Sequence, residues 1–176
     1  MRNRIEEAKQ AVRNIPDFPI EGIQFKDLTT LMKSPQHLTT VSDALYEMYK
    51  EKGITKVVGI ESRGFIFGAI LAARLGAGFV PIRKPGKLPA EVISKTYDKE
   101  YGTDTIEIHR DAITNDDVVL IHDDLLATGG TILAALELVQ SMKPRDVMIN
   151  FVCGLSDLHG RDMLPKEIEV TTVFDF

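Results

Sequence analysis

The sequence contains a single cysteine, Cys153, which lies in an apolar run. One cysteine cannot form a disulfide within the chain or supply a cysteine-based metal site, and it suits a reducing compartment. Positive charge is also scarce, because 21 lysines and arginines stand against 26 acidic residues, for a net charge of −5. Such a chain lacks the basic face that nucleic acids need, so an anionic ligand must meet cations that are placed locally.

Long apolar runs are missing as well. The N-terminus has no apolar signal core, and the longest nearly apolar run, residues 65–73, is too short to span a bilayer. We therefore expect a cytoplasmic protein with neither a membrane nor a nucleic acid as partner. The length of 176 residues and the ordinary composition predict one domain over residues 1–176.

The most informative stretch is VVLIHDDLLATGGT, residues 118–131. Four aliphatic residues predict a strand that is covered on both faces, and Asp123 and Asp124 follow it. The turn that comes next consists of small and hydroxyl residues: Ala127, Thr128, Gly129, Gly130 and Thr131. It leads into a helix-like run, residues 132–139. Because glycines let a backbone approach an anion and the N–H groups at a helix start bind it, the turn predicts a phosphate site.

The acidic pair suits a sugar. Asp123 and Asp124 offer only acceptor oxygens, which cannot hold a phosphate but suit vicinal hydroxyl groups. Sugar beside phosphate suggests a ribose 5-phosphate. The pattern is neither a Walker loop nor the dinucleotide fingerprint. A buried strand that simply turns into a helix is the alternative, although apolar cores rarely need two adjacent aspartates.

His122, directly before the pair, has two interpretations. It could be a hydrogen-bonded core residue, which we favour, or it could shift the titration of the aspartates.

Strands that alternate with helices from Lys56 onward predict an α/β fold with a mainly parallel sheet. Buried strands are expected at residues 56–60, 78–82, 146–153 and 168–174. Helices are expected from the apolar spacing of residues 5–15, from the Ser34-Pro35 start, at residues 65–75 and, as a short segment, at residues 155–164. The order of the strands stays open. Ligands of such sheets bind at the carboxyl ends of the strands.

The run Asp-Asp-Leu-Leu-Ala-Thr-Gly-Gly-Thr resembles the phosphoribosyl-diphosphate motif of the type I phosphoribosyltransferases. The resemblance implies that family's fold, a mainly parallel sheet flanked by helices, with a small N-terminal hood at about residues 16–28 and a β-ribbon lid at about residues 84–108. It also implies a homodimer, and Mg²⁺ that is held by the diphosphate and water with no direct protein ligand.

The segment FPIEGIQFKD, residues 18–27, resembles the hood of those family members that use adenine and phosphoribosyl diphosphate (PRPP) in purine salvage. The resemblance implies that Phe25 stacks on adenine while backbone groups near Gln24 and Lys26 read its edge. Stacking suits any purine, so hydrogen bonds must select the base. A strap across the core is the alternative for the segment. A member that uses hypoxanthine, guanine or xanthine is the nearest alternative for the activity.

Cations follow two of the predicted strands. Ser62 and Arg63 resemble the family's diphosphate loop, which implies a cis peptide near Glu61-Ser62, although Arg63 could equally pair with Glu61 at the surface. The second loop carries three cations within five residues: Arg83, Lys84 and Lys87. They form the local positive patch that a diphosphate requires, with a solvated basic loop as the alternative. The resemblance implies that Lys84 and Lys87 bind diphosphate, and that Arg83 reaches a neighbouring subunit's site.

The alternating pattern of residues 90–108 predicts a polar β-ribbon around a turn, and such long excursions are often active-site lids. The turn carries Glu100-Tyr101-Gly102, which matches the family's lid. The resemblance assigns proton transfer with the purine to Glu100, with Tyr101 as a lid residue, and stabilisation of the leaving diphosphate to Arg63. A solvated turn carboxylate is the alternative for Glu100.

Two other classes fit less well. A regulator that binds PRPP without turnover usually needs a DNA-binding module and a basic face. A phosphoacceptor receiver domain has its acidic pair after the first strand and needs no glycine turn.

Overall fold

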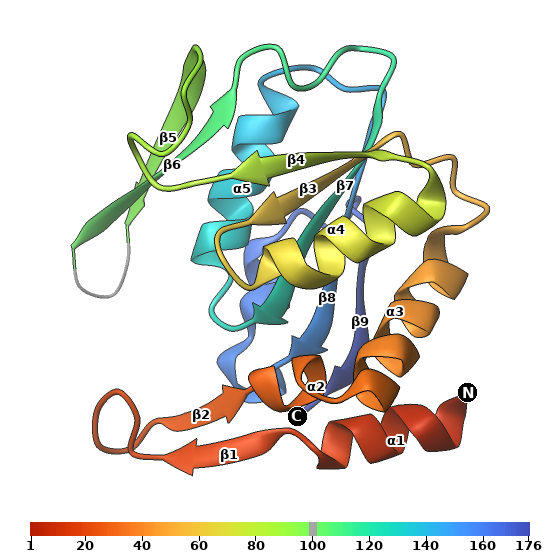
Figure 1. The fold of residues 1–176 in the computed structure, drawn as a ribbon. Coiled ribbons are helices and arrows are strands. Elements are labelled where there is room, and N and C mark those ends of the chain that lie inside the picture. Colours follow the sequence, from red (N-terminus) through yellow and green to blue (C-terminus); the bar gives the residue numbers. More distant parts are fainter. Residues whose placement is uncertain (99–101) are drawn as a thin grey trace.

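The computed structural model describes residues 1–98 and 102–176. Its centre is a five-stranded parallel sheet in the order β4-β3-β7-β8-β9 (Figure 1). The strands are β3 (Lys56–Ile60), β4 (Gly78–Ile82), β7 (Val118–Leu126), β8 (Asp146–Gly154) and β9 (Val170–Asp175). The predicted parallel α/β fold is confirmed, and the strand order places β7, which carries the acidic pair, in the middle.

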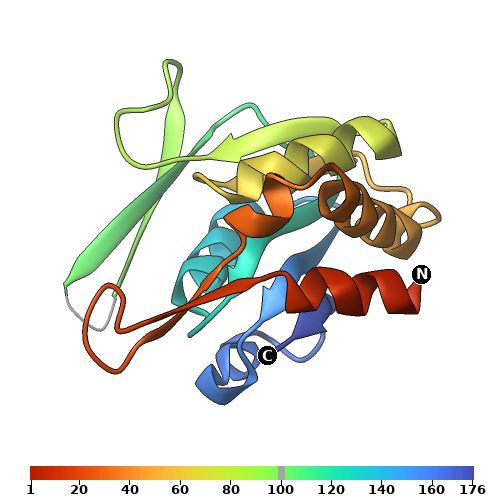
Figure 2. The same ribbon diagram turned by 60° about the horizontal axis from the view of Figure 1, so that its bottom comes forward.

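Helices cover both faces of this sheet (Figures 1 and 2). On one face, α3 (Pro35–Tyr49) and α4 (Gly64–Leu75) belong to one buried apolar cluster, and on the other face α5 (Gly130–Gln140) belongs to a second cluster. Successive residues of a strand point to opposite faces, so Leu120 of β7 joins the first cluster and Ile121 joins the second. A strand buried on both faces is what its unbroken aliphatic run predicts.

The helix that starts at Ser34-Pro35 is confirmed. Ser34 Oγ accepts a hydrogen bond from His37 N at 3.3 Å, and Pro35 is the first helical residue. The segment predicted as a short helix at residues 155–164 consists of two 3₁₀ turns, η1 (Ser156–Leu158) and η2 (Gly160–Met163). A further short helix, α2 (Thr29–Met32), precedes α3.

The N-terminal helix is shorter than its apolar spacing predicts. α1 (Arg2–Gln10) ends early, and β1 (Arg13–Pro16) pairs antiparallel with β2 (Gln24–Asp27). Pairing across the chain competes with the helix here, because Arg13 Nε also donates to Asp27 Oδ2 at 3.1 Å. The predicted hood is therefore a hairpin, which extends beside the main sheet (Figure 2).

The predicted β-ribbon is confirmed as β5 (Val92–Asp98) paired antiparallel with β6 (Thr103–His109). It lies beside α5, away from α3 and α4 (Figure 1). Glu100 and Tyr101, which the sequence placed in the lid, lie outside the described residues. None of the helices in residues 1–98 and 102–176 has the length and apolar character that crossing a bilayer takes.

Candidate active site

The turn after β7 forms a small cavity of about 100 Å³, lined by Phe151 and by residues between Asp123 and Ile132. Gly129 has φ of 91°, a conformation that favours glycine. No described side chain caps the start of α5, so its first N–H groups are available to an anion. The turn thus has the geometry that a phosphate site requires.

The 3₁₀ turn η2 packs directly against the glycine turn that follows β7. A Cβ atom at Gly160 would lie 2.1 Å from the carbonyl oxygen of Ala127, and one at Gly129 would lie 2.5 Å from the carbonyl oxygen of Gly160. Real Cβ atoms essentially never come so close, so glycine at both positions lets the two backbones touch. The shape of the turn therefore depends on a segment about 30 residues further along the chain.

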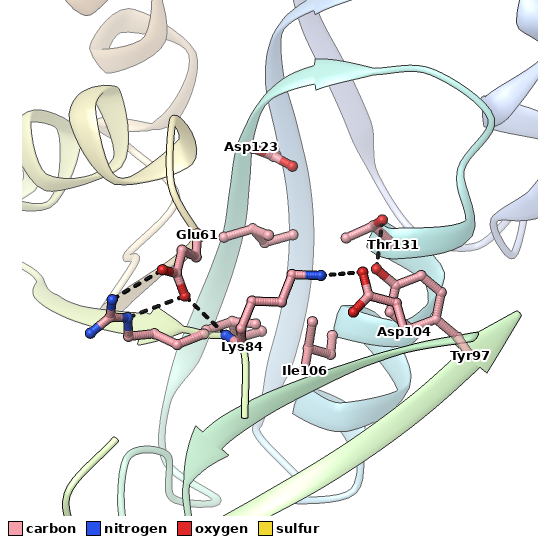
Figure 3. A pocket seen from close by; sticks show the side chains of 10 residues that line it. Glu61, Lys84, Tyr97, Asp104, Ile106, Asp123 and Thr131 are labelled. Atoms are coloured by element: carbon pink, nitrogen blue, oxygen red, sulfur yellow. Dashed lines mark hydrogen bonds and ion pairs between the residues drawn. The ribbon is translucent and has the colours of Figure 1, made fainter. Parts of the chain in front are cut away.

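A second cavity, of about 220 Å³, adjoins the turn (Figure 3). Its walls come from β3, β4, the ribbon, β7 and α5, and it is lined by Ile60, Glu61, Ile82, Arg83, Lys84, Tyr97, Asp104, Ile106, Asp123 and Thr131. The two cavities share Asp123 and Thr131. The structure therefore brings the phosphate turn, one of the two aspartates and the basic loop together at one edge of the sheet.

β7 is longer than predicted and includes both aspartates, which the sequence placed at its end. Asp124 is only 2% exposed, and its backbone N–H donates to Asp123 Oδ1 at 2.9 Å. Burial raises the pKa of Asp123 well above its usual range, and the adjacent charge of Asp124 raises it further. Burial raises the pKa of Asp124 too, against the opposing effect of Arg63. A pair of this kind favours a ligand that donates hydrogen bonds or carries positive charge.

Arg63 connects the acidic pair to the hood. Its Nε lies 2.8 Å from Asp124 Oδ2, so its partner is Asp124 and the alternative of a pair with Glu61 is wrong. The guanidinium carbon also lies 5.6 Å from the centre of the Phe25 ring, which packs against the Phe18 ring with an angle of 73° between the ring planes. The peptide bond before Ser62 is cis, as the resemblance implied. Neither Ser62, Arg63 nor the hood lines the two cavities described above.

The remaining hood residues make contacts of their own. Gln24 Oε1 accepts a hydrogen bond from Asn14 Nδ2 at 2.7 Å, and Lys26 Nζ lies 4.5 Å from the centre of the Phe176 ring.

Two glutamates hold the basic loop in place. Glu61 accepts hydrogen bonds from Arg83 Nη2 at 3.0 Å and from the backbone N–H of Lys84 at 2.9 Å, and these hold the pKa of its carboxyl below the usual value. Glu107 accepts from the backbone N–H of Gly86 at 3.1 Å. Arg83 and Lys84 reach the cavity, whereas Lys87 is exposed and does not line it.

Two further residues of the cavity were missed by the sequence analysis. The Tyr97 hydroxyl lies 3.0 Å from Thr131 Oγ1, and the Asp104 carboxylate forms an ion pair with Lys84 (Figure 3). A signal was available for Tyr97. In the alternating pattern of β5, the polar residues Ser94, Thr96 and Asp98 share one face, so Tyr97 lies on the opposite face of the strand.

His122 is buried, and its Nδ1 lies 2.8 Å from Asn150 Oδ1. Burial lowers its pKa to about 4, so the ring is neutral near pH 7. The favoured interpretation of His122 as a hydrogen-bonded core residue is confirmed.

Known proteins with the same arrangement are numerous. Residues 27–175 match the family described as phosphoribosyl transferase domain. An adenine phosphoribosyltransferase of Bacteroides thetaiotaomicron is 63% identical over 93% of each chain. The crystal structure of adenine phosphoribosyltransferase from Rhodothermus marinus superposes with a TM-score of 0.94 at 50% identity, over 100% of both chains. The Giardia lamblia enzyme complexed with 9-deazaadenine reaches 0.93 at 44% identity, over 98% of this chain and 97% of that one. The chain therefore belongs to the phosphoribosyltransferase family and, within its type I branch, to the adenine phosphoribosyltransferases.

Proposed function

We propose that the chain transfers the phosphoribosyl group of PRPP to adenine, so that AMP and diphosphate form in purine salvage. One observation carries this proposal: the glycine turn, the acidic strand end and Lys84 line two cavities that share Asp123 and Thr131. PRPP has a 5′-phosphate, a sugar and a diphosphate in that order. In the same order, the chain has the backbone N–H groups of the turn, carboxylate oxygens that can accept hydrogen bonds from sugar hydroxyls, and the cations of the basic loop.

The phosphate and the sugar are proposed to lie on the β7–α5 segment. The backbone of residues 127–131 receives the 5′-phosphate, with hydroxyl donors from Thr128 and Thr131. Asp123 and Asp124 receive the ribose hydroxyls. Cleavage at the sugar C1 develops oxocarbenium character, as glycoside cleavage does, and buried carboxylates nearby stabilise that positive charge.

The diphosphate is proposed to leave toward Arg63, Lys84 and Lys87, with Ser62 as a hydroxyl donor. These groups stabilise the negative charge that develops as the C1–oxygen bond breaks. Arg83 is proposed to reach the site of a partner subunit in a homodimer. In the single chain its guanidinium is held by Glu61, so this role requires it to leave that carboxylate.

The lining of the larger cavity is compatible with Mg²⁺. It presents carboxylate oxygens from Asp123, the donor type that Mg²⁺ prefers together with water and substrate phosphates. Within the described part of the chain, no group of three His, Cys, Asp or Glu could hold a metal ion. We propose that Mg²⁺ is held by diphosphate oxygens and water, where it supplies positive charge beside the leaving group.

Adenine is proposed to stack on Phe25, with the backbone near Gln24 and Lys26 reading its edge. Glu100 is the candidate for proton transfer with the purine, a contribution usually worth about a hundredfold to ten-thousandfold, with Tyr101 beside it in the lid. Holding the two substrates together contributes more, on the order of 7–11 kcal/mol. We place the reaction in the cytoplasm, which suits a chain with one buried thiol, Cys153.

The experiment is to mix the chain with PRPP, Mg²⁺ and one base at a time, and to follow diphosphate release. Adenine is expected to support turnover, while hypoxanthine, guanine and xanthine support little. Asp123→Asn should lose most of the activity, and Asp116→Asn, which changes an exposed carboxylate outside the site, should retain it. Binding of PRPP without diphosphate release would indicate a regulator instead, and faster turnover with another base would contradict the assignment to adenine.

A further inference from the structure

We infer that Tyr97 and Asp104 are positioning residues that act on the two ends of PRPP, an inference that rests on the function proposed above. The two residues face each other across the β5–β6 ribbon, because Tyr97 pairs with Asp104 in the strand register. Both line the larger cavity. Figure 3 shows their contacts side by side, from Tyr97 to Thr131 and from Asp104 to Lys84.

Tyr97 acts on the phosphate turn. Its hydroxyl lies 3.0 Å from Thr131 Oγ1, and its ring packs against the apolar cluster that includes α5. On the same face of β5, Lys95 Nζ lies 2.7 Å from Glu137 Oε2 of α5, which fixes the strand against the helix. A threonine hydroxyl has one proton and two acceptor positions. If the tyrosine donates to Thr131 Oγ1, the threonine proton stays available for the 5′-phosphate.

Asp104 acts on the diphosphate end. Its carboxylate forms an ion pair with the Lys84 ammonium, and its side chain is 15% exposed against 45% for Lys84. The Lys84 backbone is fixed separately, since its N–H donates to Glu61. Asp104 therefore directs the long lysine side chain into the cavity before substrate arrives.

The Asp104 carboxylate and the diphosphate compete for the same ammonium. A diphosphate carries several negative charges, so it is repelled by a carboxylate that stays beside Lys84. Binding must then break the Lys84–Asp104 pair. While diphosphate is absent, the Asp104 carboxylate pairs with Lys84 and keeps its side chain in position. This pairing lowers the affinity for diphosphate.

A binding experiment with two ligands tests the roles of Tyr97 and Asp104 separately. Calorimetry on the full chain would measure diphosphate with Mg²⁺, and AMP. Asp104→Asn should lower the Kd for diphosphate by roughly fivefold and leave AMP unchanged, because an ion pair of this exposure is worth about 1 kcal/mol. Tyr97→Phe should raise the Kd for AMP by roughly fivefold and leave diphosphate unchanged, because one hydrogen bond is worth about 1 kcal/mol.

Three further variants show whether Asp104 acts through Lys84. Asp98→Asn removes an exposed carboxylate of the same ribbon, to which no ion pair is assigned within the described residues, and should change neither Kd. Asp104→Glu keeps the charge and should restore the wild-type Kd for diphosphate. In a Lys84→Gln background, Asp104→Asn should no longer improve diphosphate binding.

Several results would overturn the inference while the proposed function stands. In each case the wild-type chain binds both ligands. The inference fails if Asp104→Asn leaves diphosphate binding unchanged or weakens it, or if Asp104→Asn still improves diphosphate binding in the Lys84→Gln background. It also fails if Tyr97→Phe weakens the binding of AMP and of diphosphate equally. If the wild-type chain bound neither ligand, the proposed function itself would fail.

Discussion

At the scale of single residues, Asp27 carries more contacts than its place at the end of a short strand suggests. Its Oδ2 pairs with Arg13 across the hood hairpin, and its Oδ1 accepts from Thr29 N at 3.0 Å and from Thr29 Oγ1 at 2.6 Å. These bonds lower the pKa of Asp27 from 3.8 to about 2. The charged carboxylate thus fixes the base of the hairpin that carries Phe25.

We predict that Asp27→Asn lowers the free energy of unfolding at pH 7 by about 1–2 kcal/mol, because the amide cannot replace the charged bonds to Arg13 and Thr29. The pKa in the folded state lies below the value of the free residue. The stabilisation is therefore complete above about pH 4, and it is lost as the pH falls through about 2.

Denaturant unfolding of both proteins at several pH values measures this effect. The difference between them should shrink steadily below pH 4. Glu21→Gln, which changes an exposed carboxylate of the same hairpin, serves as the control and should have no effect. An equal difference at pH 7 and at pH 2.5 would show that Asp27 acts without its charge.

Residue types predicted part of the site. Adjacent aspartates and a glycine turn predict a phosphate and sugar site because few other structures need them, and Asp123 and the turn line one cavity. Partners are harder to predict, since a side chain reaches neighbours that are distant in the sequence. Arg63 could pair with Glu61 or with something else, and only the fold brings Asp124 to it. Asp104 offered no signal of its own, because a carboxylate near a turn is ordinarily solvated.

At the scale of elements, the phosphate turn and η2 form one unit. Gly160 of η2 leaves room for the carbonyl oxygen of Ala127, and Gly129 leaves room for that of Gly160. We predict that Gly160→Ala raises the Kd for AMP tenfold or more, because relieving a 2.1 Å approach must displace the turn.

Calorimetry with AMP and with diphosphate tests this prediction. The loss should be confined mainly to AMP, whose 5′-phosphate is proposed to occupy the turn. Gly78→Ala is the matched control, since its Cβ would come closest to the flexible Lys56 side chain, at 3.3 Å, and would lie at an ordinary contact distance of 3.8 Å from the Thr55 carbonyl oxygen. Wild-type AMP affinity in Gly160→Ala would mean that η2 does not shape the turn.

The elements differ in how well the sequence predicts them. Buried strands and α3 to α5 follow from local pattern, because each buries a continuous apolar run. The N-terminal helix was predicted too long, since apolar spacing at residues 12 and 15 fits a helix as well as a strand. Pairing with β2, which is a tertiary contact, decides between them.

At the scale of the whole molecule, the site lies where the strands of a parallel sheet end, and β7 lies at the centre of the sheet. The class of fold followed from the alternation of strands and helices. The order of the strands did not, because local pattern carries no information about which strands are neighbours. That order brings the loop after β3 and the loop after β4 to the same side of β7.

The proposed homodimer leads to a complementation test. If Arg83 acts in the partner's site and Lys84 in its own, Arg83→Ala and Lys84→Ala chains are each inactive alone. Co-expressed chains should form mixed dimers in which one site has both cations, with roughly half of the wild-type activity per mixed dimer. Diphosphate release measures it on mixed dimers that are purified through a different affinity tag on each chain, and light scattering checks a mass of about twice 19.6 kDa. Absence of recovery in verified mixed dimers would place Arg83 in its own site.

The central claim is that the backbone of residues 127–131 receives the 5′-phosphate while the two aspartates hold the sugar. A crystal structure of the chain with AMP tests it most directly. The phosphate is expected against the N–H groups of the turn, the ribose hydroxyls within hydrogen-bond distance of Asp123 or Asp124, and the base on Phe25. A phosphate bound anywhere else, with the turn open to solvent, would contradict the account.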